Sequence, residues 1–138
     1  MEVSSIRNGV IIDHVPAGTA LEVLAYLDID PASTRLALVM NAPSTRYGTK
    51  DIIKMEGDVP VDLEALAIVA PRATVAIVEN GVITGKHAPT LPDRVVNVIR
   101  CVNPRCVTGS ERGLDHVFYR VPGRHAFRCE YCDEEALR

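Results

Sequence analysis

Short apolar runs in the N-terminal part of the chain alternate with segments of helical spacing. The runs at residues 9–13, 35–40 and 50–56 are rich in Val, Ile and Leu and predict strands. Pro16 is expected to stop the first run. The polar segment NAPSTRYG reads as a loop between the second and the third.

Two further segments place apolar side chains three and four residues apart, which predicts amphipathic helices. The first is GTALEVLAYLDI, with Thr19 as its expected N-terminal cap. The second is VPVDLEALAIVAP, with Asp62 as the expected cap and Pro71 as the stop.

The segment ATVAIVENGVITGK contains two β-rich runs joined by Asn80-Gly81, a dipeptide favoured in tight hairpin turns. The predicted order is therefore β-α-β-β-α-β-β. A split β-α-β unit used twice gives an α+β fold, a ferredoxin-like sandwich with both helices on one face of an antiparallel sheet. The other sheet face would be open to solvent or to a partner.

The segment HAPTLPDR, with two prolines and no strong periodicity, predicts a linker into a second domain. We therefore expect one domain at residues 1–93 and a small, zinc-ribbon-like β domain at residues 94–138. In the second domain, HVFYRV, Pro122-Gly123 and HAFRC predict a hairpin that carries the second cysteine pair. A chain this short seldom buries enough apolar surface to fold without a metal or a disulfide.

Composition and charge narrow the function classes. The chain has 138 residues, is 47% hydrophobic and 24% charged, and shows neither a secretory signal pattern nor an apolar run long enough to span a membrane. A cytoplasmic protein is expected. Residues 1–96 carry 8 Lys+Arg against 12 Asp+Glu, and residues 97–138 carry 7 against 6. Neither part has the clustered positive charge that phosphate-backbone binding requires, which argues against a nucleic-acid partner.

All four cysteines lie in two pairs, CVNPRC and CEYC, separated by 22 residues. This spacing is close to that of a zinc ribbon, and one Zn²⁺ per chain is expected. Four thiolates fill a tetrahedral shell and leave no position for water or substrate, so the ion would be structural. The alternative is four unrelated buried thiols. The expected ligands are Cys101, Cys106, Cys129 and Cys132.

Basic residues beside the predicted strands are the other notable feature. Lys50 and Lys54 would project to the same sheet face because they are four residues apart. Asp13 and His14 would point to opposite faces of a regular strand and could share a site only where the strand ends. With Lys86, these groups suit a ligand that has hydroxyls and phosphates. The simpler interpretation, solvated charges on exposed strand faces, is favoured by spacing alone.

No nucleophile motif, glycine-rich phosphate loop or H-E-x-x-H sequence is present. The sequence therefore gives no reason to expect an enzyme. Two other classes compete on the same fold. A zinc-ribbon adaptor for RNA or transcription is opposed by the charge balance and the scarcity of aromatic residues. A small hydrolase of the acylphosphatase kind would need an arginine-bearing phosphate loop, and DHVPAGTA has none.

Four segments and the four cysteines, taken in order, resemble the regulatory chain of aspartate carbamoyltransferase. The segments are GVIIDHVPAG, KDIIKME, ENGVITGK and LPDRVVNVIRC. The resemblance covers nearly the whole chain, and the combination of segments is much more specific than any one of them. It implies a non-catalytic allosteric subunit in pyrimidine biosynthesis. Its first domain would pair with a second regulatory chain and bind CTP, often with UTP assisting, or ATP as a competing activator. Its zinc domain would dock onto the catalytic chain.

The resemblance also implies roles for individual residues. Asp13 and Lys54 would contact the ribose of the effector, and Lys86 with His14 would contact its phosphates. Lys50 corresponds to a residue near the phosphates of a second nucleotide.

The base would be framed by Ile6, Ile83 and the backbone near Gly81, with Val3 on the same path. The four cysteines match the zinc ligands of the family. Asn103 and Arg105 correspond to positions that contact the catalytic chain.

Three departures from the family pattern bear on these expectations. Ala76 stands where a polar residue near the phosphates is common, and Arg105 replaces a residue that is often Asn. The chain also ends six residues after Cys132, so the zinc domain is expected to lack a terminal strand.

Overall fold

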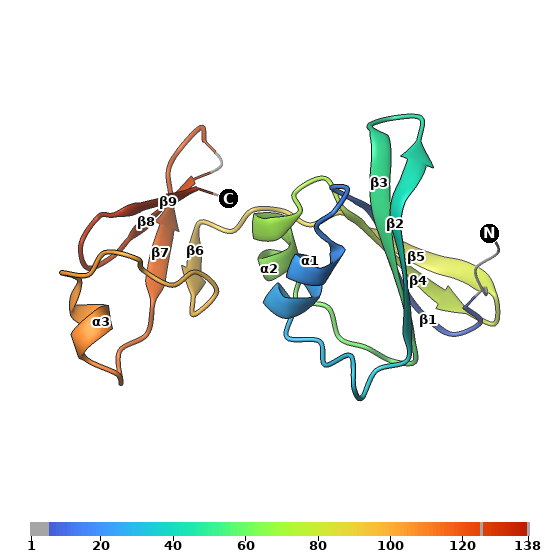
Figure 1. The fold of residues 1–138 in the computed structure, drawn as a ribbon, viewed down its shortest axis with the longest axis horizontal. Coiled ribbons are helices and arrows are strands. Elements are labelled where there is room, and N and C mark those ends of the chain that lie inside the picture. Colours follow the sequence, from blue (N-terminus) through green and yellow to red (C-terminus); the bar gives the residue numbers. More distant parts are fainter. Residues whose placement is uncertain (1–5, 125, 138) are drawn as a thin grey trace. The chain divides into compact units, whose positions relative to one another are not determined.

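The computed structural model describes residues 6–124 and 126–137 of the chain. It divides into two compact units, Met1–Thr90 and Leu91–Arg138 (Figure 1). Each unit is described by itself. Among the described residues, no helix has the length and apolar character needed to cross a lipid bilayer.

Within the described residues, the first unit contains a five-stranded antiparallel sheet in the order β2-β3-β1-β4-β5. Two helices, α1 and α2, cover one face of it (Figure 1). This is the predicted α+β, ferredoxin-like sandwich, and the predicted order β-α-β-β-α-β-β is confirmed. The elements are β1 (Gly9–Val15), α1 (Ala20–Tyr26), β2 (Leu36–Ser44), β3 (Gly48–Glu56), α2 (Leu63–Val69), β4 (Thr74–Glu79) and β5 (Val82–His87).

Two local predictions, the Asp62 cap and the Asn80-Gly81 turn, are confirmed. The Asp62 carboxylate accepts hydrogen bonds from the N–H groups of Glu64 and Ala65, at 3.1 and 3.2 Å, and so caps α2. Asn80 and Gly81 have φ of 52° and 79°, which allows the tight β4–β5 turn to follow the twist of its strands.

Three expected boundaries were wrong. β1 continues past Asp13 to Val15, and β2 and β3 extend into the segment predicted to be a loop, leaving Thr45, Arg46 and Tyr47 as the turn. β2 carries an irregularity between Val39 and Ala42, which allows the hairpin to continue beyond the apolar run.

The predicted cap of α1 was also wrong. Thr19 is at the capping position, but its hydroxyl donates to the carbonyl of Pro16, at 2.7 Å, and makes no side-chain cap. The carboxylate of Asp51 in β3 takes this role. Its Oδ2 accepts from the N–H groups of Gly18 and Ala20, at 2.8 and 3.0 Å. Its Oδ1 accepts from the N–H of Asn41 in β2, at 2.9 Å.

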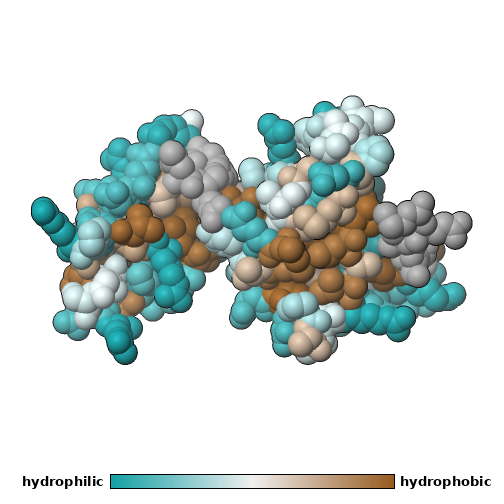
Figure 2. Space-filling model, viewed as in Figure 1, coloured by the Kyte–Doolittle hydropathy of each residue, from teal (hydrophilic) through white to brown (hydrophobic). Residues whose placement is uncertain are grey.

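The core of the first unit lies between the helices and the sheet. Alternate residues of β1 and β3 point into it, and Ile12, Ile53 and Met55 are fully buried, as are Leu66 and Ile68 of α2. On the outside, apolar side chains gather on the visible face of the first unit (Figure 2). Leu21 of α1 and Leu63 of α2 remain exposed.

The second unit contains, in its described part, a four-stranded antiparallel sheet in the order β6-β7-β8-β9. The predicted hairpin is confirmed as β7 (Val117–Arg120) and β8 (Ala126–Cys129), and its core is built on Phe118 and Phe127. A short helix, α3 (Val107–Ser110), follows Cys106.

The second unit contains one strand that was not predicted and one whose absence was wrongly expected. The first is β6 (Arg94–Val96), which begins at the last residue of the predicted linker. The short C-terminus nevertheless forms a terminal strand, β9 (Glu135–Leu137), which pairs with β8. β9 needs only three residues because backbone hydrogen bonds to β8, and not a long apolar run, hold it in place.

Asp51→Asn is expected to destabilise the first unit by about 2–3 kcal/mol, because the amide replaces a charged acceptor with a donor that faces backbone N–H groups. The measurement is urea unfolding followed through the amide NMR signals of β1, β3 and α1. Asp62→Asn is the matched control. Asn caps a helix as well as Asp, so we expect this change to cost less than about 0.5 kcal/mol. Equal losses in the two variants would contradict the role given to Asp51.

Candidate functional site

One row of residues crosses the sheet face that the helices leave open. Lys54 of β3 pairs with Ile11 of β1, Ile11 pairs with Ala76 of β4, and Ala76 pairs with Lys86 of β5. Directly paired residues project to the same face. Lys54 and Lys86 therefore lie on the open face at the two ends of this row, about 14 Å apart at the usual strand spacing.

A bulge near the end of β1 brings Asp13 and His14 into one site. The pairing of β1 with β3 shifts between Ile12 and Val15, and His14 has φ of 59°. In this conformation the His14 ring lies 3.2 Å from the hydroxyl of Thr74, measured from Nδ1 to Oγ1. Asp13 pairs directly with Thr74. The two residues share a site because of the bulge, and not because the strand ends at this point.

The open face contains a pocket of about 410 Å³ where β1, β4 and β5 meet. Four of the residues predicted for the effector site line it together: Asp13, His14, Ile83 and Lys86. The rest of its lining is formed by Ile11, Thr74, Val75, Ala76, His87 and Ala88.

The other predicted residues lie around this pocket or apart from it. The Lys50 ammonium forms an ion pair with Asp13, with Nζ 3.0 Å from Oδ1. Lys54 is on the same sheet face but does not line the pocket. Ile6 is half-buried, and Gly81 is in the exposed β4–β5 turn, where its N–H donates to the carbonyl of Arg7 at 2.8 Å. Val3 lies outside the described residues.

The charges of this face favour an anionic ligand with hydroxyl groups. Within the described residues, neither Lys54 nor Lys86 forms an ion pair, whereas Asp13 is neutralised by Lys50. Ammonium groups without a carboxylate partner attract phosphate oxygens, and the Asp13 carboxylate can accept from a hydroxyl.

Sequence reasoning missed three residues beside this pocket. The Tyr47 ring contacts the His14 ring edge to face, with centroids 6.1 Å apart. The guanidinium groups of Arg72 and Arg46 lie over the Tyr47 ring, 5.0 and 5.6 Å from its centroid. The only hint in the sequence was an aromatic residue close to basic ones at the β2–β3 turn. The sequence does not show that Tyr47 contacts His14, because this contact depends on the pairing of the β2–β3 hairpin with β1.

The four cysteines converge in the second unit. Cys101 and Cys106 come from the loop before α3, whereas Cys129 ends β8 and Cys132 lies in the following turn. All four sulfur atoms lie within 4.8 Å of one another, with 3.5 Å from Cys101 to Cys132 and 3.8 Å from Cys106 to Cys129. A tetrahedral ion with metal–sulfur bonds of about 2.3 Å has sulfur–sulfur edges of about 3.8 Å, so the donor set fits such an ion.

Backbone and side-chain hydrogen bonds hold this arrangement. The Asn103 side chain accepts from the N–H of Arg105, at 3.0 Å, and the Asn103 carbonyl accepts from the N–H of Cys106, also at 3.0 Å. These bonds close the loop between the first two cysteines and leave Arg105 exposed. The N–H of Cys101 donates to Nδ1 of His116, at 3.2 Å.

The thiols differ in acidity. Burial raises the pKa of the Cys101 thiol to about 12, and burial also raises the pKa of Cys129. The hydroxyl of the buried Thr108 donates to the Cys106 sulfur, at 3.1 Å, and lowers the pKa of Cys106 to about 7. Cys106 therefore provides a thiolate near neutral pH more readily than Cys101 or Cys129.

The first unit is an α+β sandwich with a polar pocket on its open face, and the second is a small β domain whose four cysteines can hold a metal ion. Comparison with protein families gives the same division of the chain. The allosteric domain of the aspartate carbamoyltransferase regulatory chain matches residues 1–90, and the metal-binding domain of that chain matches residues 93–138. The protein belongs to the family of aspartate carbamoyltransferase regulatory chains, as its sequence segments predicted.

Several regulatory chains of aspartate carbamoyltransferase align with this chain over nearly their whole length. The regulatory chain of Bifidobacterium longum (strain NCC 2705) is 60% identical over 137 residues, which cover 99% of both chains. That of Clostridium botulinum (strain Hall) is 41% identical over 97% of this chain and 92% of the relative. That of Clostridium tetani is 37% identical over 97% and 94%. The protein is accordingly a non-catalytic, allosteric subunit of a pyrimidine-biosynthesis enzyme with a metal-binding domain, and the expectation that it is not itself an enzyme is confirmed.

Removal of the metal is expected to unfold the second unit and to leave the first unit folded, because the second unit has only a small core of its own. The measurement is an amide NMR spectrum before and after chelation. We expect the signals of residues 91–137 to lose dispersion and those of residues 6–90 to keep it. A second unit that stays folded after verified metal removal would contradict this expectation.

Metal affinity is expected to fall as the pH falls, because protons compete with the ion for the thiolates. With Cys101 and Cys129 protonated at neutral pH, binding displaces at least two protons, so the affinity falls at least about 100-fold per pH unit. Below about pH 7 the dependence steepens, since Cys106 then also holds a proton.

Thr108→Val removes the hydroxyl and is expected to move this steepening to higher pH. Competition with a chromophoric chelator over a pH series measures it. Ser110→Ala is the matched control, since the Ser110 hydroxyl donates to the carbonyl of Val107, at 3.2 Å, and not to a thiol. A shift in both variants, or in neither, would rule out the role given to Thr108.

Proposed function

We propose that this chain binds CTP, and ATP in competition with it, in the pocket on the open face of the first unit. The observation that carries the proposal is the convergence of Asp13, His14, Ile83 and Lys86 in one pocket. These residues come from β1 and β5, which are separated by β4, so their meeting follows from the fold and not from sequence proximity.

The ribose and phosphates are assigned to charged groups of this face. Asp13 accepts from the ribose hydroxyls with the help of Lys54, and Lys86 and His14 contact the phosphates. A triphosphate carries several negative charges, and Lys86 is free of carboxylate partners among the described residues, so it can give its full charge to the ligand. Lys50, held beside Asp13, is placed near the phosphates of a second nucleotide, for which UTP is the proposed occupant.

The base is assigned to the β4–β5 hairpin and the start of the first unit. CTP and ATP share the ribose and the triphosphate, so only the base can distinguish them. Ile6 and Ile83, with backbone groups near Gly81, frame the base. Ala76 lies between Ile11 and Lys86 in the row across the sheet and has no hydrogen-bonding side chain. The phosphate end therefore depends more strongly on Lys86 and His14.

The metal is assigned as one structural Zn²⁺ per chain. Four thiolates are ligands that Zn²⁺ favours, and they fill its tetrahedral shell without leaving a position for a substrate. Cys101, Cys106, Cys129 and Cys132 would hold the ion, and its binding energy would contribute to the folding of the zinc domain. Closely paired thiols that stay reduced also suit a cytoplasmic location.

The remaining assignments concern assembly. We assign residues 1–93 to nucleotide binding and to pairing with a second regulatory chain, and residues 94–138 to the contact with the catalytic chain. Asn103 and Arg105 lie in the loop between the first two cysteines, and this loop would present them to that chain. Nucleotides can alter the catalytic chains only if they bind the two global states of the enzyme with different affinity.

Calorimetric titration of the metal-loaded full chain with CTP, repeated in saturating ATP, tests the effector site. We expect ATP to compete CTP away. Lys86→Ala is expected to weaken CTP binding roughly 10- to 100-fold, the range given by one charge-assisted hydrogen bond to phosphate. It is expected to change the binding of cytidine, which has no phosphate, by less than about threefold.

Arg35→Ala is the control, because Arg35 is exposed and pairs with Glu56 at 3.1 Å, away from the pocket. Binding of CTP that ATP does not affect would contradict the shared site. Unchanged CTP affinity in both Lys86→Ala and Lys54→Ala would show that the nucleotide binds elsewhere.

A further inference from the structure

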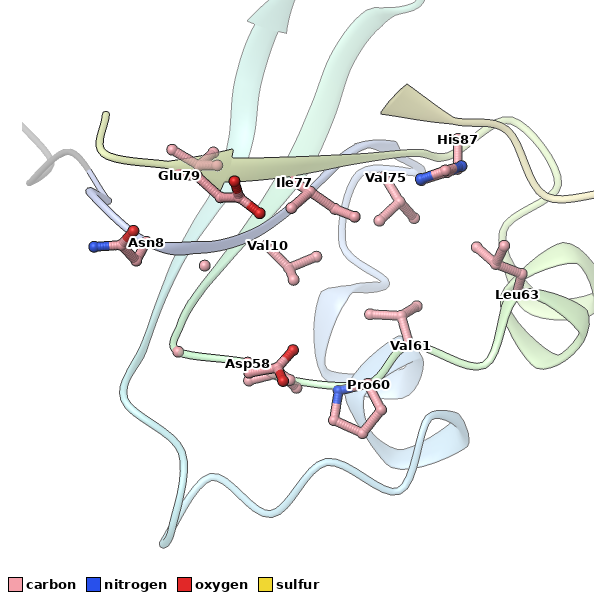
Figure 3. A pocket seen from close by; sticks show the side chains of 14 residues that line it. Asn8, Val10, Asp58, Pro60, Val61, Leu63, Val75, Ile77, Glu79 and His87 are labelled. Carbon is pink, nitrogen blue, oxygen red and sulfur yellow. The ribbon is translucent and has the colours of Figure 1, made fainter. Parts of the chain in front are cut away.

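A second and larger pocket lies on the other side of β1 and β4. It has a volume of about 590 Å³, within the range of about 300–1,000 Å³ that is usual for small-molecule sites. It is formed by β1, β4 and the loop that leads from β3 into α2 (Figure 3). It shares only Val75 and His87 with the lining of the proposed effector pocket, and the cysteine cluster belongs to the other unit.

The walls of this pocket are mainly apolar. Val10 comes from β1, Val75 and Ile77 from β4, and Val61 and Leu63 from the loop and the first turn of α2. In Figure 3, Val10, Val61, Val75 and Ile77 lie around its middle. A ligand that fills it would therefore need an apolar body.

One end of the pocket carries negative charge. Asp58 of the loop and Glu79 at the end of β4 line it, and Figure 3 shows their carboxylates directed toward its interior from opposite walls. Neither carboxylate has an ion-pair partner in the part of the chain that the structure describes. Leu63 and His87 lie at the opposite end. The charge at the Asp58 and Glu79 end is complementary to a cation.

We propose that this pocket binds a small organic cation, an ammonium or guanidinium group on a compact apolar body. The cationic group would lie between Asp58 and Glu79, and the body would cover Val10, Val61 and Ile77. Carboxylates without a partner form charge-assisted hydrogen bonds with an ammonium group. They repel an anion, and their hydrogen bonds with a neutral alcohol are much weaker. This selectivity is opposite to that of the effector pocket, which suits phosphates.

The position of the pocket gives its occupant access to the strands of the effector site. Val10 and Val75 of this pocket are sequence neighbours of Ile11 and Ala76, which line the effector pocket on the opposite sheet face. Val75 and His87 line both pockets. The site is nevertheless defined by its own walls and charges, so it does not depend on whether nucleotides bind as proposed.

Three probes with one body and different head groups test the proposal: 3-phenylpropylamine, 3-phenylpropanol and 3-phenylpropionate. Each is titrated into the metal-loaded full chain, with methyl NMR signals as the readout. We expect the amine to shift the methyl signals of Val10, Val61 and Ile77 saturably and to bind at least about threefold more tightly than the alcohol. The carboxylate is expected to produce no saturable shift there. The methyl signals of Val39 and Ile52, away from this pocket, are the internal reference.

Charge-removing variants complete the experiment. Asp58→Asn and Glu79→Gln each keep the side-chain shape, and each is expected to weaken the amine severalfold while leaving the alcohol unchanged. Asp28→Asn is the matched control, because Asp28 is exposed, lies outside the pocket and has φ of 55°, which Asn tolerates. Thermal unfolding of each variant checks that its fold is intact. Equal binding of the amine and the alcohol, shifts confined to other surfaces, or equal weakening by Asp28→Asn would overturn the proposal.

Discussion

The buried carboxylate of Asp51 in β3 joins three other parts of the first unit. Its two oxygens accept from backbone N–H groups of the loop before α1, of α1 itself and of β2. Asp51 also pairs with Val15, the first residue of β1 after the bulge. One buried carboxylate therefore holds the start of α1 and the irregular part of β2 beside the bulge that shifts the register of β1 against β3. A buried carboxylate is tolerated here because backbone donors take the place of its lost hydration.

The chemistry of the open sheet face follows from this register. Lys50 precedes Asp51 in β3 and therefore projects to the opposite face, where it meets Asp13. The bulge in β1 turns His14 toward Thr74 and Tyr47 and away from the alternation of a regular strand. A positive φ has a conformational cost for a residue other than glycine. In His14 this backbone conformation occurs together with the contacts of its ring with Thr74 and Tyr47. The pocket is thus the product of an irregular strand end that the surrounding regular sheet holds in place.

The two units reach stability by different means. The first has two helices packed on its sheet and buries a continuous apolar layer. The second has a small sheet around Phe118 and Phe127, and its cysteines form a cluster whose donor atoms fit a tetrahedral ion. A domain of that size gains little from apolar burial alone, and a metal ion held by the four cysteines would add the stability that its small core does not supply. Burial raises the pKa of the Cys101 and Cys129 thiols, so these two would lose their protons on binding the ion.

The sequence by itself determined the order of strands and helices, the Asp62 cap, the Asn80-Gly81 turn and the four cysteines that form the cluster. These features depend on residues close together in the chain or on a spacing that few other structures share. The sequence did not reveal that Asp51 caps α1, that Tyr47 packs on His14, or that β9 completes the second sheet. Each of these depends on a partner distant in sequence and brought near only by strand pairing. The meeting of Asp13 and Lys86 in one pocket was expected only from the family resemblance, because they lie on strands separated by a third and the local pattern of residues does not show that these strands become neighbours.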